Sequence, residues 1–172
     1  MANGGVEMTA LKGEQAMALE VGMRGEASLV VGEEQTAAAF GAGGVRVFGT
    51  PVMIGLMENA AWQLVQPELA PGETTVGILV NVRHLAATPI GARVTATAEL
   101  VQIDGRRLVF HVSARDETQL IGEGTHERSR VLLERFLARL PKSPDAAGER
   151  RIISACALAT GREWCDTIPL LR

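Results

Sequence analysis

The segment that most constrains the fold is residues 50–65, which the sequence pattern predicts to be an apolar helix carrying one charged side chain, Glu58. Thr50 is a good N-cap, and Pro51 suits the first helical position, where its missing N–H is not needed. Apolar side chains cover more than one face, namely Met53, Ile54, Leu56, Met57, Ala60, Ala61, Leu64 and Val65. Such a wide apolar surface indicates a helix that is buried almost all round.

Four strand-like runs follow this helix. They span residues 75–85, 92–103, 107–115 and 120–133, and Asp104-Gly105 predicts a hairpin turn between the second and the third. A further strand is expected within residues 15–31, and a short helix within residues 134–140. One buried helix and a meander of antiparallel strands predict an α+β class, with a long central helix wrapped by an antiparallel β-sheet, which is the outline of a hotdog fold.

The chain of 172 residues is expected to form one folded domain. Residues 1–15 are predicted to be a loose N-terminal lead-in, and residues 16–140 the domain itself. A Pro- and Gly-containing linker at residues 141–148 opens a C-terminal tail, residues 141–172, which we expect to be peripheral.

The composition argues against several classes of function. The net charge is −3 with no long run of one sign, so no nucleic-acid partner is expected. No apolar stretch approaches the roughly 20 residues that span a bilayer, and the N-terminus lacks the pattern of a signal peptide. Cys156 and Cys165 belong to no metal-ligand motif and indicate no disulfide framework, which favours a cytoplasmic location.

Three residues have the chemistry of a hydrolytic site: Thr50 at the helix start, Glu58 within the helix and His84 at a strand end. Burial would disfavour the charged form of Glu58 and raise its pKa towards that of a useful base. Thr50 also fits a simple N-cap, although a helix N-terminus suits a developing oxyanion. A lone histidine on an apolar strand face, as at His84, is more often structural than catalytic.

Several short motifs, in order and at fixed spacing, carry a family resemblance. They are Val47-Phe48-Gly49-Thr50-Pro51 with Glu58-Asn59-Ala60, Val80-Asn81-Val82-Arg83-His84, Gly105-Arg106-Arg107-Leu108 and Gly122-Glu123-Gly124-Thr125-His126-Glu127-Arg128. Over residues 15–140 the chain resembles the hotdog-fold acyl-CoA thioesterases, and among them the fluoroacetyl-CoA thioesterase branch. The resemblance implies that Thr50, Glu58 and His84 are catalytic and that Gly77 and Arg128 bind substrate.

The resemblance implies hydrolysis of a short or small acyl-CoA thioester to free acid and CoA, with no metal or other cofactor. Two alternatives remain open: a non-catalytic acyl-CoA-binding hotdog protein, and an enoyl-thioester hydratase or dehydratase. One departure concerns the lid before Thr50, where the fluoroacetyl-specific enzyme has aromatic residues and this chain has Gly41, Gly43 and Gly44. We interpret His126 as a support for the region of Arg128.

Helix and strand geometry predicts a homodimer with sites at the subunit interface. Thr50 and Glu58 are separated by about 12 Å along one helix, and Gly77 and His84 by roughly 23 Å along one strand. An antiparallel pairing of strand 75–85 with its mate near Val80 would bring Gly77 of one chain close to His84 of the other. Because Gly77 and His84 differ in parity, we expect them to point to opposite faces of the sheet.

Overall fold

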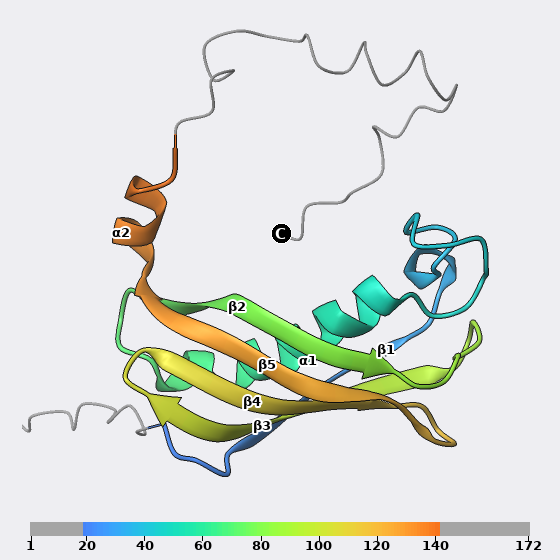
Figure 1. The fold of residues 1–172 in the computed structure, drawn as a ribbon, viewed down its shortest axis with the longest axis horizontal. Coiled ribbons are helices and arrows are strands. Elements are labelled where there is room, and N and C mark those ends of the chain that lie inside the picture. Colours follow the sequence, from blue (N-terminus) through green and yellow to red (C-terminus); the bar gives the residue numbers. More distant parts are fainter. Residues whose placement is uncertain (1–18, 142–172) are drawn as a thin grey trace, which may run out of the picture. The chain divides into compact units, whose positions relative to one another are not determined.

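A computed structural model describes residues 19–141 (Figure 1). The predicted lead-in, residues 1–15, lies outside the described residues, as do both cysteines and the predicted tail beyond Pro141. The proposed domain boundaries therefore stay predictions.

The described residues form one antiparallel sheet and one long helix, in the order β1 (Arg24–Val30), η1 (Glu33–Gln35), α1 (Thr50–Val65), η2 (Gln66–Glu68), β2 (Glu73–His84), β3 (Arg93–Asp104), β4 (Arg107–Arg115), β5 (Leu120–Leu132) and α2 (Leu133–Ala138). The strand order in the sheet is β1-β3-β4-β5-β2. The expected α+β architecture is confirmed, and the four later strands begin and end within one or two residues of the predicted positions.

The sheet curves over α1 and buries its inner face against the helix (Figure 1). In β3, for example, Val94, Ala96, Ala98 and Leu100 are fully buried, while the residues between them are partly exposed. This alternation is what an antiparallel sheet with one solvated face requires. Each large side chain buried in this core contributes roughly 1.5–3 kcal/mol of hydrophobic free energy.

The environment of α1 differs from the sequence prediction in two ways. Only one side of the helix is buried within the chain, through Met53, Leu56, Met57, Ala60, Ala61 and Val65. Gly55 and Trp62 are exposed, so the expectation of a helix buried almost all round is wrong for a single chain. The N-cap is Gly49 rather than Thr50, and Thr50 is the first helical residue. The hydroxyl of Thr50 is therefore not used in capping.

Strand β2 lies at an edge of the sheet and contains a β-bulge. Its register against β5 shifts between Gly77 and Leu79, so Ile78 is the additional residue. Gly77 lies opposite Arg128 and His84 opposite Gly122, two β5 positions that have the same parity. The bulge thus places Gly77 and His84 on the same face, and the expectation of opposite faces is wrong. No helix among residues 19–141 is long and apolar enough to cross a membrane.

Candidate active site

The first part of the candidate site is a hydrogen bond between the start of α1 and the end of β2. The Oγ1 atom of Thr50 lies 2.8 Å from Nδ1 of His84. The other ring nitrogen of His84, Nε2, is buried and has no hydrogen-bond partner among the described residues. A buried ring nitrogen normally has a partner, so this side of the ring is suited to a substrate, a water molecule or a second chain.

The second part surrounds the carboxylate of Glu58. Its Oε1 lies 3.5 Å from His126 Nε2 and 3.7 Å from Arg128 Nη1. Gly77 faces the same carboxylate, because a Cβ atom on Gly77 would come within 2.5 Å of Glu58 Oε1. Glu58 therefore lies beside a cation, an imidazole and bare backbone, all from the edge strand β2 and its neighbour β5.

Arg128 is held in this position by buried hydrogen bonds. Its Nε donates to Thr75 Oγ1 at 2.8 Å, and its Nη2 donates to the backbone oxygen of Thr75 at 2.9 Å. Burial lowers the pKa of Arg128 from its ordinary high value, and the charge of Glu58 opposes that shift. A buried guanidinium is costly unless it is paired, so the nearby carboxylate compensates part of its desolvation.

These two parts do not meet within one chain. Thr50 and Glu58 are eight residues apart on the same continuous helix, about 12 Å along its axis. The chain thus brings Thr50 together with His84, and Glu58 together with Gly77 and Arg128. Each of the five candidate residues belongs to one of the two groups, and neither group contains all three candidate catalytic residues.

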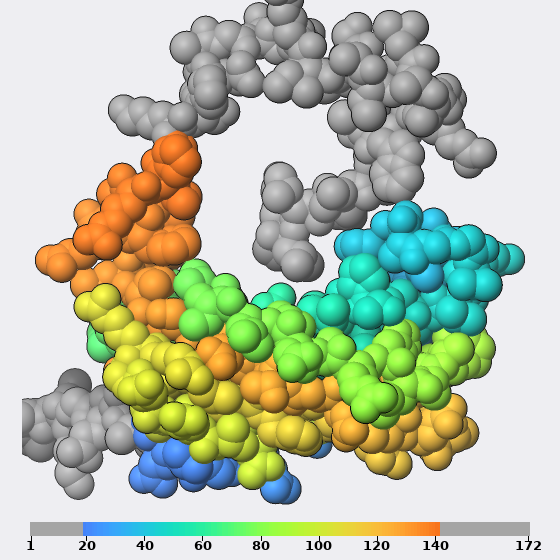
Figure 2. Space-filling view, viewed as in Figure 1, coloured from blue at the N-terminus to red at the C-terminus, as the bar shows by residue number. Residues whose placement is uncertain are grey.

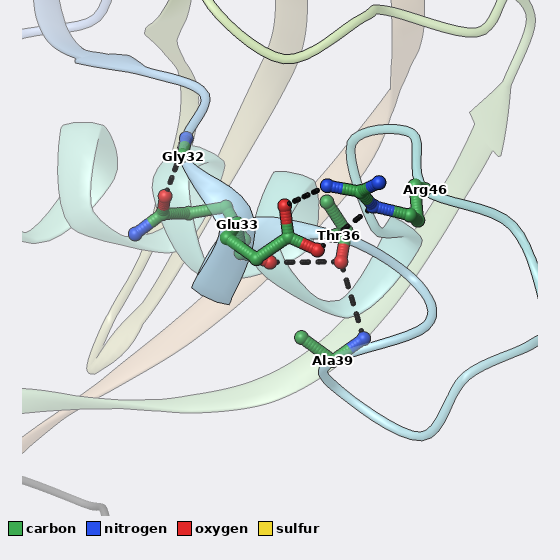
Figure 3. A network of polar contacts seen from close by, with 6 residues as sticks. Gly32, Glu33, Thr36, Ala39 and Arg46 are labelled. Carbon is green, nitrogen blue, oxygen red and sulfur yellow. Dashed lines mark hydrogen bonds and ion pairs between the residues drawn. The ribbon is translucent and has the colours of Figure 1, made fainter.

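The segment before α1 forms a compact loop (Figure 3), and Gly49, the residue before Thr50, donates its N–H to the Gln35 carbonyl of this loop. Thr36 Oγ1 donates to the Glu33 carbonyl and accepts from the Ala39 N–H, while Arg46 forms two hydrogen bonds to the Glu33 carboxylate. The loop is joined to the connection between β2 and β3 through a bridge between Val47 and Pro89. In Figure 2 it forms the cyan surface next to the green turn that follows β2. The Gly-rich residues of the expected lid lie within this loop.

Burial and polar contacts at the site differ from what the sequence pattern suggests. Glu58 has a 37% exposed side chain, so the expected burial of this carboxylate is not found within a single chain. Arg128, in contrast, is buried, although an isolated arginine in a strand is more often a solvated surface residue. Sequence reasoning did not find Thr75, because a threonine in a strand carries no pattern that distinguishes a hydrogen-bond partner from a surface residue.

Comparison with known proteins defines the class of the chain. Residues 31–134 match the family model described as fluoroacetyl-CoA-specific thioesterase. The chain is 48% identical over 100 residues to a fluoroacetyl-CoA thioesterase of Streptantibioticus cattleyicolor, an alignment covering 58% of this chain and 72% of the relative. A solved fluoroacetyl-CoA thioesterase structure matches with a TM-score of 0.69 at 41% identity, covering 73% of this chain and all of that one.

More distant structures have the same fold. A thioesterase superfamily member from Thermus thermophilus matches with a TM-score of 0.65 at 31% identity, covering 69% of this chain and 88% of that one. These similarities define a hotdog-fold thioesterase. The chain belongs to the fluoroacetyl-CoA-specific thioesterase family and is an acyl-CoA thioester hydrolase.

Proposed function

We propose that the chain hydrolyses a small acyl-CoA thioester through Glu58, Thr50 and His84, with the substrate placed by Gly77 and Arg128. The observation that supports the proposal is that all five residues fall into two compact groups. One is the hydrogen-bonded pair of Thr50 and His84, and the other is the Glu58 carboxylate beside Arg128 and Gly77. Glu58 is the base or nucleophile, since its carboxylate is partly accessible and its nearest basic neighbours among residues 19–141 lie 3.5 Å and 3.7 Å away. Thr50 and His84 assist attack and proton transfer.

The N-terminus of α1 supplies a place for the developing oxyanion. Pro51 has no N–H, whereas the first helical N–H, that of Thr50, has no backbone acceptor among the described residues. Free N–H groups and the positive end of the helix dipole stabilise an anion at such a position. Thr50 can therefore contribute both its backbone N–H and its hydroxyl to the attack on the thioester carbonyl.

We further propose that the active enzyme is a homodimer in which each site takes Thr50 and His84 from one chain and Glu58, Gly77 and Arg128 from the other. Three consecutive apolar residues of edge strand β2 support this: Ile78, Leu79 and Val80 are 53%, 43% and 41% exposed. An exposed apolar edge strand is a surface for pairing with another strand. Because the bulge directs Gly77 and His84 to one face, an antiparallel β2 pair keeps them on one side of a continuous sheet.

A mixing experiment tests this shared site. Chains with Thr50→Ala and chains with Glu58→Ala, each inactive alone, are unfolded together and refolded. Random pairing should restore about a quarter of the wild-type activity, because about half of the dimers are hybrids and each hybrid has one intact site of two. Thiol release from the acyl-CoA is the measurement.

The matched control mixes Thr50→Ala with His84→Ala. Both residues lie in the same half of the site, so no hybrid dimer contains an intact site, and no activity should return. Recovery in this control, or no recovery with Glu58→Ala despite confirmed hybrid dimers, would contradict the shared site.

The proposal also concerns the acyl group of the substrate. The relatives are named for fluoroacetyl-CoA, whereas the lid of this chain is glycine-rich, and Cβ atoms at Gly43 and Gly44 would meet nothing within 4 Å. We propose that this open lid accepts small acyl groups other than fluoroacetyl. Thiol release from fluoroacetyl-, acetyl-, propionyl- and butyryl-CoA should give kcat/KM values within about one order of magnitude. A pocket that fitted the acyl group closely would instead discriminate by about 10–200-fold for each methylene.

A strong preference for fluoroacetyl-CoA alone would overturn the open-lid proposal. Tight binding of every thioester without thiol release would instead favour the non-catalytic binder, and addition of water to an enoyl thioester would favour the hydratase. A cytoplasmic location stays a prediction from the sequence.

A further inference from the structure

His126 lies at the centre of the Glu58 group, although nothing in the catalytic proposal above uses it. It is 1% exposed, its ring stacks on Phe110 with the centroids 6.2 Å apart, and it lies opposite Val80 in the register of β2 and β5. Both ring nitrogens have polar neighbours. A buried ring nitrogen normally has a partner, and here one partner belongs to the β2 bulge and the other is the guanidinium of a candidate substrate-binding residue.

The hydrogen-bond partners of the two ring nitrogens fit a single protonation state, since the Glu58 carboxylate, 3.5 Å from Nε2, forms no hydrogen bond to the ring among the described residues. Nδ1 lies 2.9 Å from the backbone oxygen of Leu79, and a carbonyl can only accept, so Nδ1 carries a proton. Nε2 lies 3.1 Å from Arg128 Nη1, and a guanidinium can only donate, so Nε2 must present its lone pair. Only the neutral ring protonated on Nδ1 satisfies both contacts.

The surroundings favour this neutral form. Burial lowers the pKa of His126 below its ordinary value, and the positive charge of Arg128 on β5 lowers it further. The hydrogen bond to the Leu79 carbonyl and the carboxylates of Glu58 on α1 and Glu127 on β5 oppose this shift, but the net direction is downward. On β4, the residue packed against the ring is the uncharged Phe110.

The contact to His126 completes the support of Arg128. Thr75 holds the Nε and Nη2 atoms of the guanidinium, and His126 holds Nη1, the guanidinium nitrogen that lies 3.7 Å from Glu58 Oε1. Without an acceptor at Nε2, Nη1 would have Glu58 as its nearest anionic partner and could close the 3.7 Å gap to form a tight ion pair. Such a pair would occupy the Glu58 oxygen and displace the guanidinium.

The other ring nitrogen acts on the bulge of β2. The carbonyl of Leu79 belongs to the residue directly after the extra residue Ile78, and it accepts from His126 Nδ1. This bond fixes the strand where its register changes, and that change is what places Gly77 and His84 on one face.

We propose that His126 is a positioning residue of the thioesterase, whose Nε2 atom holds Arg128 away from a tight pair with Glu58 and whose Nδ1–H group fixes the β2 bulge. The inference rests on the proposed roles of Glu58 and Arg128. It assigns different consequences to the two ring nitrogens: Nε2 controls the chemistry at Glu58, and Nδ1 controls the stability and register of β2.

Two substitutions separate these functions. In His126→Asn the amide nitrogen replaces Nδ1 and can still donate to the Leu79 carbonyl, but no acceptor reaches Arg128. In His126→Gln the amide oxygen replaces Nε2 and can accept from Arg128, while the donor to Leu79 is lost. We expect His126→Asn to melt somewhat below the wild type, because it loses the packing of the ring on Phe110, and to lose about tenfold in kcat, the effect of one charge-assisted hydrogen bond. We expect His126→Gln to melt earlier still and to keep kcat within about threefold.

This crossed pattern is the result that a purely structural histidine would not give. If kcat falls in proportion to melting temperature in both variants, or if His126→Asn is the more active of the two, the positioning role is wrong. A double-mutant cycle gives a second readout: in an Arg128→Lys background, His126→Asn should cause no further loss of kcat. Additive losses would show that His126 does not act through Arg128.

The protonation state is measured independently of activity. In the wild-type enzyme at neutral pH, ¹⁵N NMR of the His126 ring should show a protonated Nδ1 and an unprotonated Nε2. An imidazolium or the Nε2–H tautomer would overturn the inference. Loss of activity in Glu58→Gln tests the proposed function separately, since that result does not depend on the state of His126.

Discussion

At the scale of single residues, the site depends on a glycine that makes room for a carboxylate. Gly77 lies on β2 opposite Arg128, on the same side of the sheet as Glu58. A side chain there would occupy the space of the Glu58 carboxylate, and the ring of His126 is only 3.3 Å from the same point. The absence of a side chain at Gly77 thus sets the distance between β2 and Glu58.

Gly77→Ala should impair catalysis more than folding. The added methyl group would lie 2.5 Å from Glu58 Oε1, and the partly exposed, flexible carboxylate can move away with little cost in stability. Misplacing a catalytic group by about 1 Å is expected to lower kcat by about a hundredfold. Steady-state kinetics and a thermal melt of the same preparation measure the two effects.

The control for this prediction is the same substitution in a Glu58→Ala background, which is inactive and is therefore compared by its melting temperature. Once the carboxylate is removed, the methyl group at Gly77 meets no Glu58 oxygen, and it should lower the melting temperature no further. A further drop in the double variant would show that Gly77 acts on something other than Glu58.

At the scale of elements, the pattern of the sequence predicted the order and the approximate ends of α1 and of the four strands after it. The periodicity of apolar residues and the Asp104-Gly105 turn depend only on residues close together in the chain, so the elements that they define can be predicted from the sequence. The bulge at Ile78 was not predicted, because it depends on the register between β2 and β5. That single extra residue reversed the predicted relation between Gly77 and His84.

The helix start shows the same limit. Thr50 has the composition of an N-cap, yet the structure places Gly49 in that role and directs the Thr50 hydroxyl to His84. The contact joins residues 34 positions apart, so it cannot be predicted from the spacing of residues within the helix. Thr50, Glu58 and His84 could be singled out by their chemistry and position, whereas Gly77 and Arg128 came from the family resemblance alone. The rise of the helix and the strand predicted that Thr50 lies apart from Glu58 and Gly77 apart from His84.

At the scale of the whole molecule, the two elements that carry the candidate catalytic residues also expose apolar surface within one chain. Strand β2 exposes three consecutive apolar residues, α1 exposes Gly55 and Trp62, and His84 has a buried nitrogen without a partner among the described residues. All three features belong to the two elements that carry the candidate catalytic residues. Pairing of two chains along β2 would cover the apolar edge and bring the two half-sites together.

The residue at the centre of that pairing provides the sharpest test of the assembly. If two β2 strands pair about Val80, each Val80 lies next to its own copy, so Val80→Glu would bring two carboxylates together and Val80→Lys two ammonium groups. Each variant alone should be monomeric by sedimentation and should lose thioesterase activity. An equimolar mixture should form a hybrid dimer with opposite charges at the axis and recover activity. A Val80→Glu chain that remains dimeric would place the interface elsewhere, and an active monomer would show that one chain suffices for catalysis.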